Sequence, residues 1–120
     1  MAITDDADHL LKQESKTLAY CTDIEHGERL DEDVIEMARD ADLLIHDAQY
    51  TRGELPDKKG WGHSSWEQAI EVASRAGVKR LALTHHDPEH DDRFLTEMER
   101  DCQREFSECF VAREGQELEL

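Results

Sequence analysis

Basic residues are scarce in this sequence, and that scarcity limits the partners the protein can bind. Lysine and arginine number 14 against 30 aspartates and glutamates, which gives a formal net charge of −16. Because nucleic-acid binding requires a basic face, the composition argues against nucleic acid as a partner. The acidity is spread evenly, which favours a solvated, soluble surface over a dedicated cation-rich site.

Long apolar runs, a leader sequence and paired cysteines are also missing. No run of about 18 apolar residues occurs, so we predict no membrane-spanning segment. The amino-terminal MAITDDADHL has neither the basic nor the apolar region of a signal peptide. Cys21, Cys102 and Cys109 are odd in number and lack a metal-binding spacing, which indicates reduced thiols in a cytoplasmic protein.

The spacing of apolar residues predicts alternating strands and helices. Asp31, Ser64 or Ser65, and Gly77 are the expected helix caps. The order of elements predicts one α/β domain over residues 1–120 with a largely parallel sheet. The connection 48–62 is long for a compact domain, and such loops are often functional. The expected helices span 30–41, 63–77 and 91–106, and the expected strands span 17–23, 42–47 and 78–85, with shorter strands at 9–14, 108–114 and 116–120.

Acidic and histidine residues follow three of the predicted strands. Asp23 ends the strand 17–23, His46 and Asp47 end the next, and His85 ends the strand 78–85. The carboxyl ends of parallel strands lie along one edge of a sheet, so we expect these side chains to converge. Carboxylates and imidazoles together form a ligand set that zinc, manganese and iron accept.

Each candidate also has a plain structural alternative. Asp23 and Asp47 could cap turns, and His46 could be a core residue bonded to the backbone. His63, at the start of a predicted helix, could lie near backbone N–H groups that bind an anion, or could simply be a surface residue. His85 could be solvated among acidic neighbours. The remaining loop histidines are expected to be solvated, and they are His26, His86 and His90.

Four segments, taken in order, resemble a known family. AYCTD, DLLIHDAQY, GWGHSSWEQAIEVASRAGVKRLALTHHDP and AREGQELEL together resemble the C-terminal half of metallo-β-lactamase-fold hydrolases. The branch that looks most similar contains the transfer-RNA 3′-processing endonucleases of the RNase Z type and the cyclic-phosphate phosphodiesterases. The resemblance covers residues 17–120 and implies half of an αββα sandwich.

The resemblance implies a role for individual residues. Asp23, in CTD, matches the aspartate that bridges two metal ions, and His85, in LTH, matches the last metal-binding histidine. His63, in GHSS, matches a histidine outside the metal shell that contacts the phosphate and protonates the leaving oxygen. His46 and Asp47 match a His-Glu-Ala-Thr-like motif in which aspartate here replaces glutamate, and the resemblance implies that both belong to the catalytic residues with His63.

The resemblance also implies a metal-dependent hydrolase, which this chain is expected to form only in part. The complete family site holds two divalent ions, with zinc expected and manganese or iron as alternatives, and their shared hydroxide attacks a phosphodiester or other ester. The family signature His-x-His-x-Asp-His is missing, since no two histidines lie two positions apart. Asp23 and His85 are fewer ligands than the three of a usual catalytic zinc site, so the chain alone is expected to be inactive.

The missing half leaves one face of the predicted sheet without a cover, which exposes an apolar patch. We therefore expect a partner chain that supplies the amino-terminal half, self-association, or a fragment of a longer protein. Two hypotheses for the function follow. The chain is part of a hydrolase of a small phosphoester or ester, or it is a non-catalytic remnant or interaction domain.

Overall fold

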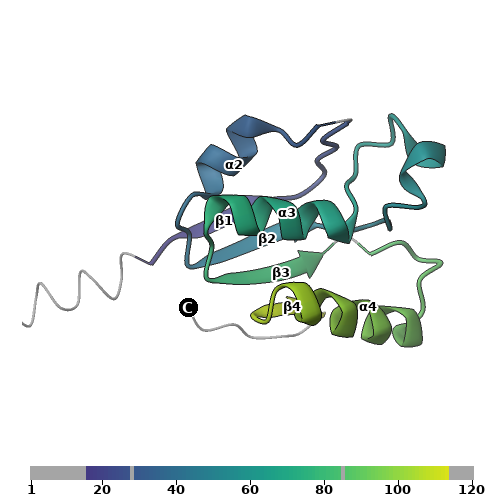
Figure 1. Ribbon diagram of the computed structural model, residues 1–120. Coiled ribbons are helices and arrows are strands. Elements are labelled where there is room, and N and C mark those ends of the chain that lie inside the picture. Colours follow the sequence, from purple (N-terminus) through teal and green to yellow (C-terminus); the bar gives the residue numbers. More distant parts are fainter. Residues whose placement is uncertain (1–15, 28, 85, 114–120) are drawn as a thin grey trace, which may run out of the picture.

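The protein was analysed as a computed structural model, which describes residues 16–27, 29–84 and 86–113. Within these ranges, four strands form one sheet in the order β1-β2-β3-β4, and each of their pairings is parallel (Figure 1). The strands are β1 (Leu18–Cys21), β2 (Leu43–Asp47), β3 (Arg80–Thr84) and β4 (Cys109–Val111). This confirms the predicted α/β fold with its parallel sheet. The strands expected at 9–14 and 116–120 lie outside the described residues, and the assignment of residues 1–120 to one domain stays a prediction.

Among the described residues, three α-helices connect the strands, and capping residues mark their ends. They are α2 (Glu32–Ala38), α3 (Trp66–Ala76) and α4 (Asp92–Glu105), and a short 3₁₀ helix, η1 (Leu55–Lys58), lies in the long loop. The Asp31 carboxylate caps α2, and Ser65 forms a reciprocal capping box with Gln68 at the start of α3. Gly77 ends α3 in the left-handed conformation, at φ 71°. These caps confirm the sequence-based expectation, with Ser65 rather than Ser64 as the cap of α3.

The register of the strands places the core on one face of the sheet. Ala19, Leu44, Leu81 and Cys109 are successive partners across the four strands, and all belong to the buried core. Residues of α2, α3 and α4 belong to the same core, so the three helices cover this face (Figure 1). No described helix is long and apolar enough to cross a membrane.

The opposite face of the sheet is partly open. On β1, Leu18 and Tyr20 point away from the helices and are 50% and 60% exposed. Tyr20 pairs with Ile45, which pairs with Ala82, so an apolar row crosses this face. No helix among the described residues packs on it, which agrees with the expectation of an incompletely covered sheet.

The cysteines correct the expectation of three reduced thiols. Cys102 in α4 forms a disulfide with Cys109 in β4, and their Cα atoms lie 6.3 Å apart. The chain turns directly from α4 into β4 and both side chains face the core, which brings the pair within bonding range. Cys21 remains a buried thiol, and burial raises its pKa to about 11. The cytoplasmic location, which rested partly on reduced thiols, stays a prediction.

Candidate functional site

The ends of β1 and β2 and the segment before α3 meet at one edge of the sheet. Asp23 lies two residues beyond β1, in the left-handed region at φ 53°. Tyr50 holds the segment before α3 in place, because its N–H donates to the Ser64 carbonyl and its carbonyl accepts from Trp66 N–H. This parallel bridge brings His63 to the end of β2.

Asp47 and His63 form the closest side-chain contact of the site. His63 Nδ1 lies 2.6 Å from Asp47 Oδ2, and the Asp47 side chain is fully buried. The other carboxylate oxygen accepts the Gln49 N–H at 3.0 Å and the Ser64 N–H at 3.4 Å. Because a carboxylate accepts hydrogen bonds and does not donate them, this contact assigns the His63 proton to Nδ1. The pair therefore orients the imidazole and fixes its tautomer.

Asp23 lies beside this pair, and its carboxylate is exposed whereas that of Asp47 is buried. Its side chain is 69% exposed, and Oδ1 lies 3.8 Å from His63 Nδ1. Ligand atoms of Asp23, Asp47 and His63 all lie within 4.8 Å of one another. Two carboxylates and one imidazole suit a divalent ion, although the Asp47 oxygens already accept hydrogen bonds. Asp23 therefore fits best as a metal ligand here, whereas His85 lies outside the described residues and its ligand role stays a prediction.

His46 belongs to a series of hydrogen bonds that runs from the exposed Asp31 N–H to the buried Asp47 carbonyl. Asp31 N–H donates to His26 Nδ1 at 3.0 Å, so the His26 proton lies on Nε2. The two Nε2 atoms of His26 and His46 lie 3.0 Å apart, and His46 Nδ1 lies 2.7 Å from the Asp47 carbonyl. Each N–H donor in this series of hydrogen bonds therefore has one acceptor, and both ring nitrogens of His46 take part in hydrogen bonds.

Burial keeps these two histidines neutral. It lowers the pKa of His46 to about 4 and also lowers the pKa of His26. With both nitrogens bonded and its side chain buried, His46 positions the end of β2, and a direct contact with substrate is not favoured. Its catalytic role stays a prediction, while the expectation that His26 is solvated was wrong.

A second cluster of acidic and histidine side chains joins the long loop to the loop after β3. Ligand atoms of Glu54, Asp87 and His90 lie within 4.8 Å of one another. The His90 side chain is 6% exposed, its ring stacks on Phe94, and Nε2 lies 3.1 Å from Glu54 Oε1. His90 was also expected to be solvated, but its side chain is largely buried and contacts Glu54, which lies 36 residues earlier. The same expectation was wrong for His86, whose ring nitrogens are both buried.

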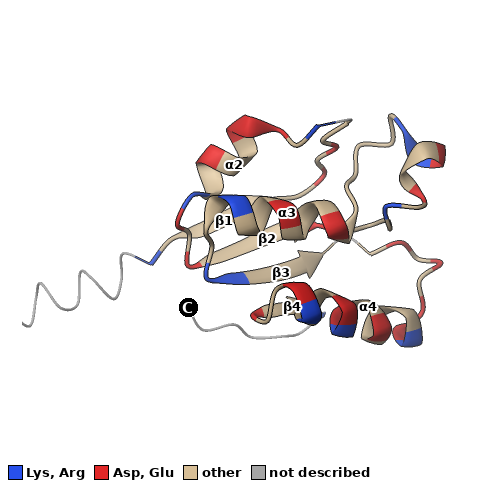
Figure 2. Cartoon of the chain, viewed as in Figure 1, with Lys and Arg blue, Asp and Glu red and all other residues tan. Residues whose placement is uncertain are grey.

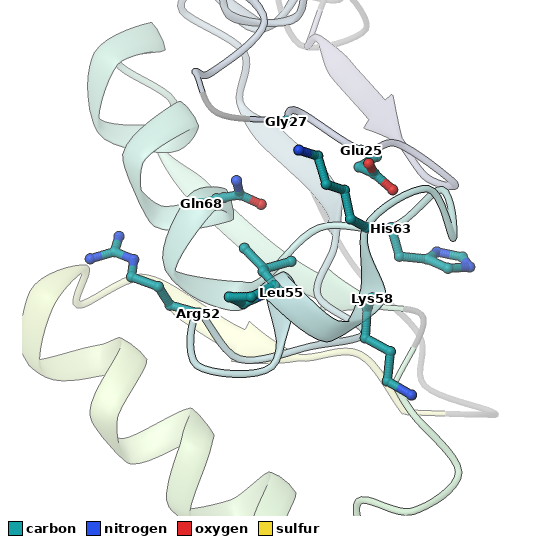
Figure 3. Close-up of a pocket in the computed structure, with 9 residues that line it drawn as sticks. Glu25, Gly27, Arg52, Leu55, Lys58, His63 and Gln68 are labelled. Atoms are coloured by element: carbon teal, nitrogen blue, oxygen red, sulfur yellow. The ribbon is translucent and has the colours of Figure 1, made fainter.

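The loop 48–62 forms one wall of a cavity of about 260 Å³ beside His63 (Figure 3). The Glu25 carboxylate accepts the N–H groups of Gly60 and Gly62, both at 2.9 Å, which ties this loop to the segment after β1. Those hydrogen bonds lower the pKa of Glu25. The sequence suggested a functional loop but did not identify these contacts, which join residues up to 37 positions apart. Basic residues contribute to the lining, and they are Arg52, Lys58 and Lys59.

Comparison with known proteins places the chain in a family. Residues 6–86 match the model described as "Beta-lactamase superfamily domain". The chain is 39% identical over 83 residues to the ribonuclease Z of Gemmatimonas aurantiaca, covering 69% of this chain and 26% of the relative. It is 42% identical over 88 residues to the ribonuclease Z of Haloferax volcanii, covering 72% of this chain and 27% of the relative. The chain thus spans about a quarter of the length of the curated relatives it matches.

Solved structures agree with this placement. The metallo-β-lactamase fold protein YhfI from Bacillus subtilis has a TM-score of 0.69 and 26% identity, over 86% of this chain and 40% of its own. The short form of human tRNase Z, at 22% identity over 86% of this chain and 32% of its own, shares the fold with a TM-score of 0.61. A diphosphatase of the PhnP family has a TM-score of 0.60 and 25% identity, over 86% of this chain and 35% of its own.

These matches confirm the resemblance that the four sequence motifs suggested. The family model covers more than half of the chain, and the fold agrees over most of it. The chain therefore belongs to the β-lactamase superfamily and has the metallo-β-lactamase fold.

Proposed function

We propose that this chain contributes part of the active site of a divalent-metal-dependent phosphodiesterase. The observation that carries the proposal is the Asp47–His63 pair beside the exposed Asp23 carboxylate. Relatives named ribonuclease Z and a structural relative named a diphosphatase support hydrolysis at phosphorus. When bound, a divalent ion lowers the pKa of coordinated water and polarises a phosphoryl oxygen.

Residues of this chain would transfer the proton and bind the metal ion. Asp47 holds His63 through Nδ1, so the opposite ring nitrogen, Nε2, is the atom at which a proton is held and passed to a leaving oxygen. The buried carboxylate also stabilises the imidazolium that forms when His63 carries both protons. Asp23 and His85 are the proposed metal ligands. Zinc is the proposed ion, with manganese or iron as alternatives, because carboxylate and imidazole ligands accept all three.

Asp23 and His85 are too few ligands for a tightly held catalytic ion, so we propose that a second polypeptide supplies the others. The test mixes this chain with an amino-terminal segment of a ribonuclease Z relative, in the presence of zinc or manganese, and measures hydrolysis of bis(p-nitrophenyl) phosphate. Activity should require both polypeptides, disappear with a chelator, and fall about 10²–10⁴-fold in His63→Ala. Two folded, associated polypeptides without metal-dependent turnover would overturn the proposal.

The second candidate is an interaction domain without catalysis. It is favoured by Tyr20 and Leu18, which are exposed on the face of the sheet that no described helix covers. Exposed apolar patches of this kind commonly mark binding surfaces. If the chain is such an interaction domain, it should form a dimer at micromolar concentration, and the Tyr20→Lys variant should be a monomer. A monomer in both proteins, measured by sedimentation equilibrium, would remove it.

A further inference from the structure

Glu25 connects the two segments that carry the functional side chains of the candidate site. It lies two residues after Asp23, and both Glu25 and His63 line the cavity (Figure 3). Its Oε1 accepts the N–H groups of Gly60 and Gly62, both at 2.9 Å, and its Oε2 accepts the Gly60 N–H at 3.0 Å. Because His63 directly follows Gly62, the Glu25 carboxylate holds the residue that precedes His63.

The turn 60–62 needs such a restraint, because glycine has the widest conformational freedom of all residues. Gly60 and Gly62 have φ of 86° and 85°, which residues with a side chain rarely adopt. Beyond the adjacent residues, a Cβ atom at either glycine would meet no described atom within 4 Å, so the glycines serve the backbone conformation and not close packing. Fixing a glycine costs more conformational entropy than fixing another residue, and the hydrogen bonds to Glu25 offset part of that cost.

The chain on the other side of His63 is bonded to the same segment. The Ser64 hydroxyl donates a hydrogen bond to the Ile24 carbonyl, and Ile24 is adjacent to Glu25. The residues immediately before and after His63 are therefore both attached to the segment that follows β1. Between these two attachments, His63 Nδ1 lies 2.6 Å from Asp47 Oδ2.

The charges around Glu25 strengthen its bonds to the turn. In Figure 2, acidic residues lie on the segment between β1 and α2, and basic residues occur on the loop 48–62. The glycine N–H groups, first that of Gly62 and then that of Gly60, lower the pKa of Glu25. The positive charge of Lys59 lowers this pKa further. Glu25 is therefore an ionised carboxylate at neutral pH, which is the form that accepts hydrogen bonds most strongly.

We infer that Glu25 is a positioning residue of the site, which holds the turn 60–62 so that His63 stays in contact with Asp47 and beside Asp23. The proton donor and the proposed metal ligand then keep one relative position, because Asp23 belongs to the segment 23–25 and His63 is attached to it on both sides. This role rests on the proposed phosphodiesterase function and adds a residue that acts on the reaction through His63.

Two variants separate the reach of the Glu25 side chain from its charge. Glu25→Gln keeps an acceptor oxygen at the same reach and loses the charge, whereas Glu25→Asp keeps the charge and shortens the side chain. Nitrogen NMR of the imidazole rings in the metal-free chain, at about pH 8.5 where imidazoles are ordinarily neutral, reports which nitrogen of His63 carries the proton. His63→Gln assigns its signals among the seven histidines. The unsubstituted chain and Glu25→Gln should show His63 protonated at Nδ1, and Glu25→Asp should show the mixed tautomers of a solvated imidazole.

Glu71 provides the matched control, because its carboxylate contacts the same loop through Arg52 and not through the turn 60–62. Glu71→Asp makes the same chemical change and should leave the His63 tautomer as it is in the unsubstituted chain. An unchanged tautomer in folded Glu25→Asp, or an equal loss in Glu71→Asp, would overturn the positioning role. Loss in Glu25→Gln with retention in Glu25→Asp would also overturn it, since charge rather than reach would then control His63.

Turnover by the reconstituted enzyme is the second readout. Glu25→Asp should lower kcat about 10²-fold with little change in KM, because a small misplacement of a catalytic group costs that much. The conservative variant Glu25→Gln should lose less than about tenfold, since its oxygen still reaches the turn. An unchanged kcat in Glu25→Asp would contradict the role of Glu25. If the unsubstituted enzyme shows no turnover, the proposed function fails, and the NMR result still decides whether Glu25 positions His63.

Discussion

At the scale of single residues, hydrogen bonds decide which imidazole nitrogens of the site can act. Asp31, His26 and His46 form a directed chain that ends at the Asp47 carbonyl, while the Asp47 side chain holds His63. His46 and His63 therefore have different tasks although both lie next to Asp47. The buried histidine positions the strand end, and the half-buried one faces the cavity.

The neutral state of His46 makes the stability of the fold depend on pH. Because the folded pKa of about 4 lies below the unfolded value, the unfolded chain binds the proton more readily as the pH falls below about 6.5. The contribution of His46 to the free energy of unfolding has its full value near neutral pH and falls by roughly 2 kcal/mol by about pH 5. Urea unfolding should reveal this loss. In His46→Leu, the free energy of unfolding should fall correspondingly less over the same pH change. An unchanged pH dependence would contradict the assignment of this loss to His46.

Mutation of Asp47 should destabilise the protein far more than mutation of Asp23. Asp47→Ala removes the acceptor of three N–H groups from a buried position, so we expect a loss of about 3 kcal/mol. Asp23→Asn keeps the preference for the left-handed backbone at an exposed position, so stability should change by less than about 0.5 kcal/mol. Thermal unfolding measures the change in stability of each variant. Zinc titration should also show weaker zinc binding by Asp23→Asn than by the unchanged protein. A stable Asp47→Ala protein would show that the buried carboxylate does not hold the site.

At the scale of elements, the start of α3 positions His63, and its cap can be tested alone. Ser65 lies two residues after His63. Its hydroxyl accepts the Gln68 N–H, and the Gln68 side-chain oxygen accepts the Ser65 N–H. Ser65→Ala should destabilise the protein by about 1 kcal/mol, because one N–H group at the helix start loses its acceptor. Ser74→Ala, the same substitution at an exposed interior position of α3, is the control and should cause no loss. Equal effects in chemical denaturation would exclude capping as the cause.

The sequence predicted those parts of the molecule that depend on local patterns. The strands at 42–47 and 78–85 were apparent from short apolar runs, and the α3 cap from Ser65 followed by Gln68. The Glu25 contacts with the loop 48–62 and the His26–His46 pair have no local signature, because folding alone brings those residues together. The convergence of Asp23 and Asp47 could be anticipated because the ends of parallel strands share one edge. His63 precedes a helix, and only the family resemblance implied its place in the site.

At the scale of the whole molecule, charge opposes compactness. With 30 acidic residues against 14 basic ones, folding brings like charges together, and their repulsion is screened over about 30 Å at 0.01 M salt but about 3 Å at 1 M. We therefore expect the urea midpoint to rise as sodium chloride increases across this range. A variant with Asp57→Asn, Glu89→Gln, Glu105→Gln and Glu108→Gln, all exposed positions, removes four negative charges and should show a smaller rise. An identical salt dependence in the two proteins would mean that specific ion binding, rather than general repulsion, controls their stability.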